Sequence, residues 1–324
     1  MQWPLIKYLP DKTNFRFVGF AKIAATLSIL GVIASIILAI YPAKSLCGGL
    51  NCGVDFKGGM TLQMTTGARQ ADIPGVRTVL ERSGLRDVRV QATNNPNEAL
   101  IQFETPEGRN PAQVIEQVKG TLRTQAGATT FSREEAVGAK VSGELFQNGV
   151  LALGLAILLM MFYIWFRFGL TFGVGAVTAL FHDVILTFGL FAVLKLEFSL
   201  TEVAAFLTII GYSMNDTVVV FDRLRENLRK YKSMPLRDVI DLSLNETLSR
   251  TIITGVTAVM VLAALAVFGG EALFGFSIAL MFGIVIGTYS SIYVGAPIIL
   301  LWGVKRGGSA DDAKPVKLGM ASRP

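Results

Sequence analysis

Histidine and cysteine are scarce in this sequence, which limits the metal and redox chemistry open to it. The chain of 324 residues contains one histidine, His182, and two cysteines, Cys47 and Cys52. Because a zinc site takes about four ligands, one histidine beside Asp183 predicts no metal centre. No glycine-rich phosphate loop, G-x-S-x-G or H-E-x-x-H motif occurs, so the sequence predicts no cofactor and argues against an intramembrane hydrolase or another enzyme.

The two cysteines allow two interpretations. They lie in the segment CGGLNC, whose spacing fits a short-loop disulfide on an oxidising face of a membrane. They would equally fit two unpaired small hydrophobic residues, because a sequence does not report whether two thiols approach bonding distance. Both interpretations remain open at this point.

Charged residues are also few, since they make up 17% of the chain against 52% hydrophobic residues. This composition is too apolar for an ordinary soluble domain and predicts a mostly α-helical integral membrane protein. The formal net charge of +6 would fit a nucleic-acid-binding protein. The basic residues instead gather at the ends of the apolar runs, so no nucleic-acid partner is predicted.

Six apolar runs are long enough to cross about 30 Å of hydrocarbon as helices. The first run is too long for a signal peptide and is expected to stay as an anchor. The predicted spans are residues 18–41, 147–166, 170–194, 199–222, 248–268 and 274–302, so that 147–306 forms a five-helix membrane domain.

The basic residues predict the orientation of these spans. By the positive-inside rule, residues 1–17, a loop at 223–247 and a tail at 307–324 lie in the cytoplasm, and residues 42–146 lie on the periplasmic side. The composition of the tail predicts disorder. The basic residues concerned are Lys7, Lys12, Arg16, Lys22, Arg223, Arg225, Arg229, Lys230, Lys232, Arg237, Lys305 and Arg306.

The segment 42–146 has the changing hydrophobic period of a small α+β domain. Leu62 and Met64 alternate as in a half-buried strand, and Ile73, Val76 and Leu80 follow at helical spacing. The order β-α-β-β-α-β predicts a ferredoxin-like fold with its core at about 60–132. A binding surface is expected rather than an active site. The remaining predicted elements are strands around 88–90, 99–103 and 128–131 and a helix beginning at Asn110-Pro111.

The fourth and fifth predicted spans contain polar groups that hydrocarbon disfavours by about 2.5 to 3.5 kcal/mol per central charge. Asn215 and Asp216 lie in the fourth span, with Asp216 about 9 Å inside the charged edge at Asp222. Arg250 returns to a comparable depth in the fifth span, which predicts an ion pair with Asp216. Arg250 and Thr254 would begin a polar stripe facing the neighbouring helices. A purely structural ion pair is the alternative.

His182 and Asp183 lie side by side in the third span. Counted from Arg167, His182 is about 22 Å along the helix, in the outer half of the membrane. Histidine is the side chain most easily moved across neutral pH, so the pair is a candidate proton relay. Simple hydrogen-bonded packing is the alternative.

Several segments carry a family resemblance. VDFKGG at 54–59 is similar to the VDFxGG motif of the SecD/SecF family of protein-export membrane proteins, and GYSMNDTVVVFDRLREN at 211–227 resembles the fourth-span motif of its SecF branch. Residues 137–145, 182–183 and 246–251 agree as well. The motif residues are Asp55, Phe56, Gly58, Gly59, Gly211, Asp222 and Arg223.

The resemblance implies a fold, a set of partners and a mechanism. Six spans would form half of the twelve-helix unit of resistance-nodulation-division (RND) transporters and pair with six from SecD, in the bacterial inner membrane with both termini cytoplasmic. The other implied partners are the SecYEG translocon with its motor SecA, YajC, YidC and the preprotein. Proton entry would drive translocation, and Asp216 and Arg250 match the proton-transport residues of the family.

Two other functions fit parts of the sequence. A buried carboxylate with a basic partner would suit a proton-coupled small-molecule RND-type transporter, although such relatives usually have a duplicated chain with two large external domains. Drug-accumulation assays would separate these classes. A purely structural assembly subunit is the other alternative, and it predicts that Asp216→Asn is harmless.

Overall fold

The computed structural model describes residues 13–41, 47–67, 70–85, 88–93, 95–104 and 109–304. The tail predicted at 307–324 and the residues before 13 lie outside this description. The chain divides into two units. Among the described residues, one unit is helical and comes from the ranges 1–42, 153–195 and 204–324, and the other is an α+β unit from the ranges 43–152 and 196–203.

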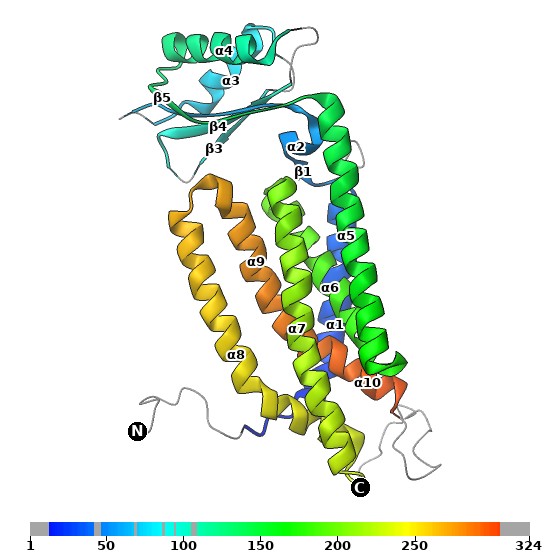
Figure 1. The fold of residues 1–324 in the computed structure, drawn as a ribbon. Coiled ribbons are helices and arrows are strands. Elements are labelled where there is room, and N and C mark those ends of the chain that lie inside the picture. Colours follow the sequence, from blue (N-terminus) through cyan, green and yellow to red (C-terminus); the bar gives the residue numbers. More distant parts are fainter. Residues whose placement is uncertain are drawn as a thin grey trace, which may run out of the picture. The chain divides into compact units, whose positions relative to one another are not determined.

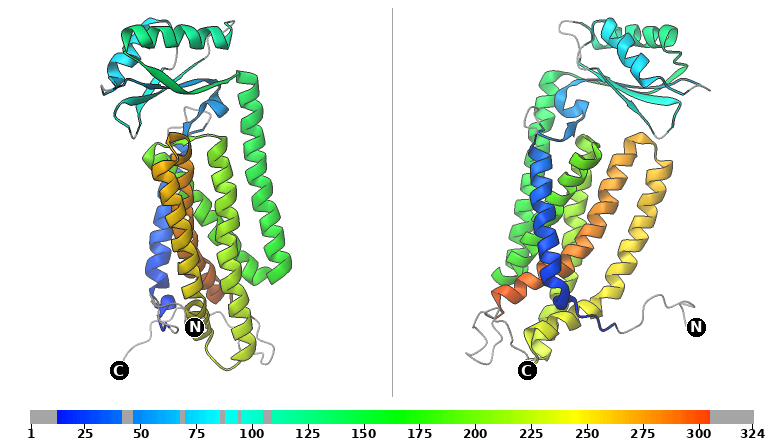
Figure 2. Two further views of the ribbon diagram at one scale, coloured as in Figure 1. Left: turned by 60° about the vertical axis from the view of Figure 1, so that its left-hand side comes forward. Right: turned by 180° about the vertical axis from the view of Figure 1, so that it is seen from behind.

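Within the described residues, six helical segments are long and apolar enough to span a membrane, as the composition predicted. Figures 1 and 2 show them in the helical unit, where α1 packs against α6, and α9 packs against both α6 and α8. Their bounds are α1 Phe17–Ile40, α5 Ala139–Phe168, α6 Leu170–Leu194, α7 Leu200–Lys230, α8 Leu236–Phe268, and a last span formed by α9 Glu271–Ser290, the π-helix η1 Ser291–Gly295 and α10 Ala296–Trp302.

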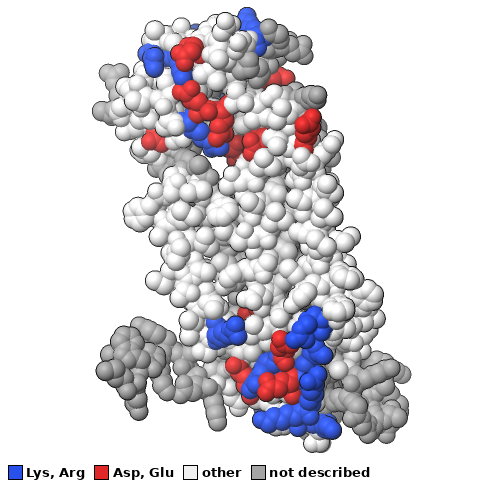
Figure 3. Space-filling model, viewed as in Figure 1, with Lys and Arg blue, Asp and Glu red and all other residues white. Residues whose placement is uncertain are grey.

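The prediction of a loop at 223–247 is wrong. Helix α7 runs on to Lys230 and α8 begins at Leu236, so most of this charged stretch is helical. Arg223 contacts Glu226 at 2.6 Å on its own helix and Glu246 at 2.7 Å on α8, which ties the two helices together beyond their apolar parts. Charged residues show where a helix leaves the hydrocarbon, but the helix can continue beyond that point. Outside the membrane, ion pairs between side chains three residues apart stabilise the exposed helix. Figure 3 shows charged side chains gathered at this end of the helical unit.

The π-turn in the last span follows from a proline. Pro297 has no N–H to donate to the carbonyl four residues earlier, and its ring crowds that carbonyl. The helix widens at this point, and the Ala296 N–H bonds to the Ser291 carbonyl five residues back. The wider turn presses against α6, where a Cβ added to Gly175 would lie 2.7 Å from the Gly295 carbonyl oxygen. Only glycine at 175 allows this approach.

The α+β unit has the predicted ferredoxin-like fold. Its strands pair in the order β3-β4-β2-β5, and every neighbouring pair is antiparallel. Figures 1 and 2 show α3 and α4 on one face of this sheet. A second small sheet pairs β1 with β6 in parallel. The elements are β1 Asn51–Cys52, α2 Val54–Lys57, β2 Gly59–Thr65, α3 Ile73–Arg82, β3 Arg89–Ala92, β4 Glu98–Phe103, α4 Pro111–Gln125, β5 Thr130–Val137 and β6 Glu197–Phe198.

Local sequence signals position the two helices on the sheet. Asp72 caps α3 by accepting from the Gly75 N–H, and Asn110 caps α4 by accepting from the Ala112 N–H. Their apolar faces and the inward face of the sheet then form one core. The fully buried side chains of that core are Met60, Leu62, Met64, Leu80, Ile101 and Leu122.

Strand β5 is longer than predicted. It covers Thr130–Val137 rather than 128–131, and its residues alternate strictly between exposed and half-buried. Its SREE stretch reads as a loop by composition, but Arg133 and Glu135 lie two residues apart on one face of the strand and form an ion pair at 2.9 Å. The alternation of a strand, and not its hydrophobicity, was the correct signal here.

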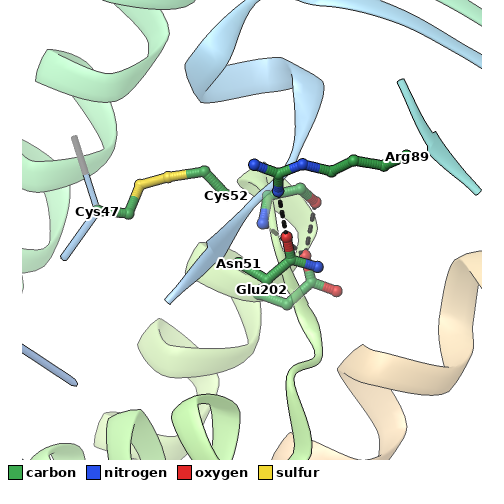
Figure 4. The surroundings of a disulfide bond; sticks show 6 residues. Cys47, Asn51, Cys52, Arg89 and Glu202 are labelled. Atoms are coloured by element: carbon green, nitrogen blue, oxygen red, sulfur yellow. Dashed lines mark hydrogen bonds between the residues drawn. A yellow bond between two sulfur atoms is a disulfide. The ribbon is translucent and has the colours of Figure 1, made fainter. Parts of the chain in front are cut away.

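The question left open by the two cysteines is resolved in favour of a disulfide. Cys47 and Cys52 are bonded, with their Cα atoms 6.1 Å apart. Figure 4 shows the bond beside Asn51, whose side-chain oxygen accepts a 2.9 Å hydrogen bond from Arg89 of β3. The disulfide therefore anchors the short strand β1 at its Cys52 end.

Replacing both cysteines with serine is expected to loosen this attachment. A cross-link between residues five positions apart lowers the conformational entropy of the unfolded chain. For so short a loop this stabilises the folded state by about 2 kcal/mol. Protease cleavage around residues 47–53 of the membrane-embedded protein should occur at a lower urea concentration in the double variant. Reducing agent should give the parent protein the same sensitivity and leave the variant unchanged. Two alkylatable thiols in the unreduced, denatured parent would contradict the bond.

Candidate functional site

Two carboxylates are enclosed among the helices of the helical unit. Asp183 of α6 is 0% exposed, and Asp216 of α7 is 9% exposed. Asp183 accepts hydrogen bonds from Ser213 Oγ of α7 at 2.5 Å and from Ser290 Oγ of α9 at 2.7 Å, both at Oδ2. Its Oδ1 lies 2.9 Å from His182 Nδ1. His182, Ser213 and Ser290 can each donate a hydrogen bond, which satisfies a buried carboxylate.

Asp216 has a separate set of hydroxyl partners. Thr251 of α8 donates to Oδ1 at 2.6 Å, and Ser291 of η1 donates to Oδ2 at 2.7 Å. Helices α7 and α8 and the π-turn therefore converge on one side chain. Neutral hydroxyls satisfy Asp216 in this arrangement.

His182 continues the polar cluster toward α1. Its Nε2 lies 3.2 Å from Ser28 Oγ, and Ser28 in turn lies 2.9 Å from the Tyr289 hydroxyl. The Tyr289 ring stacks on the imidazole with the ring centroids 5.9 Å apart. The adjacency of His182 and Asp183 in the sequence thus becomes a direct contact between their side chains.

The relative depths predicted for His182 and Asp216 need correction. The sequence placed His182 and Asp216 at different levels, but Asp183 contacts Ser213, which is three residues, or about 4.5 Å, from Asp216. The two carboxylates are therefore less than one helical turn apart along α7. The earlier count for Asp216 started at Asp222, whereas α7 continues to Lys230.

The predicted ion pair between Asp216 and Arg250 is not formed. No salt bridge joins them in the described part of the chain, and Arg250 is exposed, although it still interacts with Asp216 through space. Thr251 takes the place that the prediction gave to Arg250. A rotation of about 100° per residue separates the two side chains, so an error of one residue turns a partner away from its target.

The same error in the rotation of α8 affects the polar stripe predicted to begin at Arg250 and Thr254. Thr254 is exposed, and its hydroxyl donates to the Arg250 carbonyl of its own helix at 2.9 Å. The buried face carries Thr247, Thr251 and Gly255 instead. Asn215 is likewise exposed, on the side of α7 away from the buried Asp216.

The serines of this cluster were not among the predicted site residues. Ser213, Ser290 and Ser291 are each 0 to 1% exposed and contact a buried carboxylate. Serine within an apolar run usually bonds to its own helix, so residue type alone did not distinguish them. The available signals were the place of Ser213 in the fourth-span motif at 211–227 and the adjacent pair Ser290-Ser291 shortly before Pro297.

Glycines allow the helices to approach closely enough for these contacts. A Cβ on Gly287 of α9 would lie 3.0 Å from the Ser213 Cβ, and a Cβ on Gly283 would lie 2.5 Å from an Ile209 side-chain carbon. Both glycines therefore lie where α9 meets α7, a small-xxx-small contact between helices. The contact brings Ser213 and Ser290 to the same oxygen of Asp183.

The VDFKGG motif forms a tight turn in the α+β unit. Asp55 Oδ2 accepts a 3.0 Å hydrogen bond from the Leu200 N–H at the first residue of α7, and Phe56 packs against Phe198 with the ring centroids 5.6 Å apart. Gly58 and Gly59 have φ values of 74° and 122°, a region that favours glycine. The motif joins β2 to the small β1–β6 sheet.

A second group of acidic residues lies beside this motif. Glu197 of β6 accepts a 2.7 Å hydrogen bond from Gln102, and Glu202 accepts from the Ser199 hydroxyl at 2.5 Å. Burial raises the pKa of the Glu197 carboxyl, while Arg133 opposes the shift and Glu202 adds to it. A raised pKa means that Glu197 favours folding more at low pH, and this contribution is lost as the pH rises through the raised value.

The remaining motif residues lie on the surface of the helical unit. Gly211 and Asp222 are exposed on α7, and Asp222 forms a 3.3 Å ion pair with Arg167. Arg223 belongs to the hairpin contacts with Glu226 and Glu246. Among the residues that the structure describes, no group of three His, Cys, Asp or Glu side chains is arranged to hold a metal ion.

These features define a class of protein. The chain is a multi-pass membrane protein with a ferredoxin-like domain between its first two spans in the sequence, and its spans enclose two hydrogen-bonded carboxylates and the single histidine. Ionisable groups inside membrane spans are expensive and mark functional sites.

Comparisons with known proteins give the family. A family model described as protein export membrane protein SecD/SecF, C-terminal, matches residues 117–305. The protein translocase subunit SecF of Cereibacter sphaeroides is 44% identical over 318 residues, covering 95% of this chain and 96% of that protein. Its namesake from Rickettsia rickettsii is 41% identical over 304 residues, covering 93% and 96%. The chain belongs to the SecD/SecF family of protein export membrane proteins.

A solved structure agrees in fold. The crystal structure of SecDF, a translocon-associated membrane protein from Thermus thermophilus, matches with a TM-score of 0.81 and 31% identity. The match covers 91% of this chain and 40% of the SecDF chain. This chain therefore corresponds to less than half of that longer protein.

Proposed function

We propose that this chain is the SecF subunit of the Sec protein-export machinery and that, together with SecD, it uses the proton motive force to promote preprotein translocation. The SecF relatives, 44% and 41% identical over nearly their whole length, support the subunit assignment. The enclosed carboxylates Asp183 and Asp216 support the coupling to protons, and they are the observation that carries it. A carboxylate can bind a proton without any other ligand, and the surrounding hydroxyls can pair with either its ionised or its protonated form.

The proposed location is the bacterial inner membrane. Both termini and the α7–α8 hairpin lie in the cytoplasm in this proposal, because the basic residues gather there. The α+β unit then lies in the periplasm, where the Cys47–Cys52 disulfide forms in an oxidising environment. Preprotein leaving SecYEG would contact this unit, and YajC and YidC are further partners that the family membership suggests.

SecD is proposed to cover the exposed polar face of α7 and α8. Asn215 and Gly211 are exposed on α7, and Arg250 and Thr254 are exposed on α8. A guanidinium facing lipid would be costly, so a partner helix is expected to cover it. The SecDF match supports this arrangement, since this chain aligns with only 40% of that protein.

The proposed cycle turns on Asp216. When it is ionised, Thr251 and Ser291 donate to it, and Arg250 is near enough to attract it. Protonation removes that attraction and changes which packing of α7 and α8 is favoured. A proton crossing 100 mV supplies about 2.3 kcal/mol, enough to bias a two-state change.

The function is tested by measuring preprotein export in inverted inner-membrane vesicles with and without this chain. Export that the chain adds should disappear when an uncoupler collapses the proton gradient, and tagged chain should co-purify with SecD and the translocon. An unchanged contribution after uncoupling would contradict proton coupling. Altered drug accumulation with normal export would favour a small-molecule transporter instead.

The relay role of His182 and Asp183 gives a separate prediction. Replacing both, as His182→Ala with Asp183→Asn, should lower proton flux through the complex by about tenfold or more, because a charge-assisted hydrogen-bond network is removed. Flux is measured in vesicles by a pH-sensitive dye. Thr178→Ala on the exposed face of α6 is the matched control, because its hydroxyl bonds only to its own helix. Unchanged flux in the double variant would exclude the relay.

A further inference from the structure

Two adjacent serines each contact one of the two buried carboxylates. Ser290 is the last residue of α9 and Ser291 is the first residue of the π-turn, and both are 0% exposed. Ser290 Oγ lies 2.7 Å from Asp183 Oδ2, and Ser291 Oγ lies 2.7 Å from Asp216 Oδ2. Neighbouring residues of one helix therefore contact carboxylates on two different helices.

Each serine also has a second acceptor on its own helix. Ser290 Oγ lies 3.1 Å from the Gly287 carbonyl, and Ser291 Oγ lies 2.9 Å from the Thr288 carbonyl. A hydroxyl has one hydrogen to donate and can also accept. It can donate to the carboxylate when that group is ionised. When the carboxyl is protonated, it can accept from the carboxyl and turn its own hydrogen to the backbone carbonyl.

The second acceptor of each serine matters because both carboxylates are buried. A buried group that changes its charge must find a partner in both states, or a donor or acceptor is left unpaired. Ser290 and Ser291 supply a partner in either state through rotation of one O–H bond. No movement of a helix is required.

The other groups around the carboxylates define what can titrate nearby. Asp183 also faces His182 of α6 and Ser213 of α7, and the His182 ring stacks on Tyr289 of α9. Asp216 also faces Thr251 of α8 and interacts through space with Arg250.

A third buried serine of α9 serves as a comparison, because its hydroxyl bonds only to its own helix. Ser277 is also 0% exposed, and its Oγ donates to the Leu273 carbonyl at 2.7 Å. Such bonding to the preceding turn is common for serine in membrane helices. Ser290 and Ser291 differ from Ser277 in having a carboxylate as the other partner.

We propose that Ser290 and Ser291 are positioning residues that allow Asp183 and Asp216 each to gain or lose a proton while buried, each hydroxyl turning between its carboxylate and the carbonyl of its own helix. This inference rests on the proposed function, since it specifies how the two carboxylates hold the proton that drives the cycle. The only bond that forms or breaks is the O–H bond of the carboxyl, and each serine keeps its own hydrogen and only reorients it.

The test uses the complete complex with SecD in vesicles and the variants Ser290→Ala, Ser291→Ala and Ser277→Ala. Proton flux is measured against pH. Each of the first two should move the midpoint of the profile by about one pH unit, because a lost hydrogen bond to a charged group changes an equilibrium by about tenfold or more. The midpoint should move to higher pH, since the ionised form has lost a donor. Ser277→Ala should leave the profile in place.

The possible outcomes distinguish a failure of this inference from a failure of the proposed function. Unchanged profiles in Ser290→Ala and Ser291→Ala, with flux abolished by Asp216→Asn, would overturn the inference and leave the proposed function standing. The same shift in Ser277→Ala would also overturn it, because a buried serine without a carboxylate would then suffice. Normal flux in Asp216→Asn would remove the function on which the inference rests.

Discussion

Replacing Asp216 with asparagine is expected to abolish proton-dependent export while leaving the chain inserted in the membrane. Asparagine has nearly the same shape and keeps an oxygen that can accept from Thr251 or Ser291, which donate to Asp216 at 2.6 and 2.7 Å. It does not titrate, so the step that changes the packing of α7 and α8 is lost. Export in energised inverted vesicles should fall to the level measured with an uncoupler.

The control for this experiment is Glu226→Gln, which removes a carboxylate from the same helix. The Glu226 side chain is 62% exposed and contacts Arg223 at the solvated end of α7. An exposed ion pair contributes little to stability, so export should stay near the parent level. Normal proton-dependent export in Asp216→Asn would show that the carboxylate has a structural role alone.

Substituting alanine at Gly59 is expected to destabilise the α+β unit by roughly 2 to 3 kcal/mol, because a non-glycine residue is strained at its φ of 122°. The added Cβ would also lie 2.7 Å from the Phe103 carbonyl oxygen, at the end of the β2–β4 pairing. The β2–β4 pairing cannot move away without losing contacts in the core. The urea concentration at which protease cleaves the unit in intact membranes should fall.

Gly120→Ala is the matched control for this effect. Gly120 lies in the interior of α4, is exposed, and has nothing within 4 Å of the position of a new Cβ. Alanine is favoured over glycine there by about 1 kcal/mol, so resistance to protease should rise slightly. Equal sensitivity of the Gly59→Ala and parent proteins would contradict the role given to the turn.

The elements of the fold could be predicted because their signals are local. Apolar length identified the six spans, and alternating and helical periods identified the order of the ferredoxin-like unit. Even the start of α4 at Asn110-Pro111 followed from capping chemistry. The errors in extent fell on the charged segments, where β5 and the ends of α7 and α8 continued through residues that read as loops.

The candidate site was predicted in part. The residues expected at its centre, His182, Asp183 and Asp216, are each buried, and His182 contacts Asp183. Their hydrogen-bond partners, however, are serines and a threonine that were not among the predicted site residues, although Ser213 and Thr251 lie within the family motifs. Arg250 and Thr254 were predicted to face inward and instead face outward.

The sequence by itself determined which residues are too polar for a membrane span and how many spans there are, because both depend on transfer from water to hydrocarbon, residue by residue. Only the tertiary structure decided which of these residues meet. A helix turns about 100° per residue, so the choice between Arg250 and Thr251 depends on the rotation that packing against α7 and α9 imposes. The glycines at 283 and 287 set that packing for α7 and α9, and with it the contacts of Asp183.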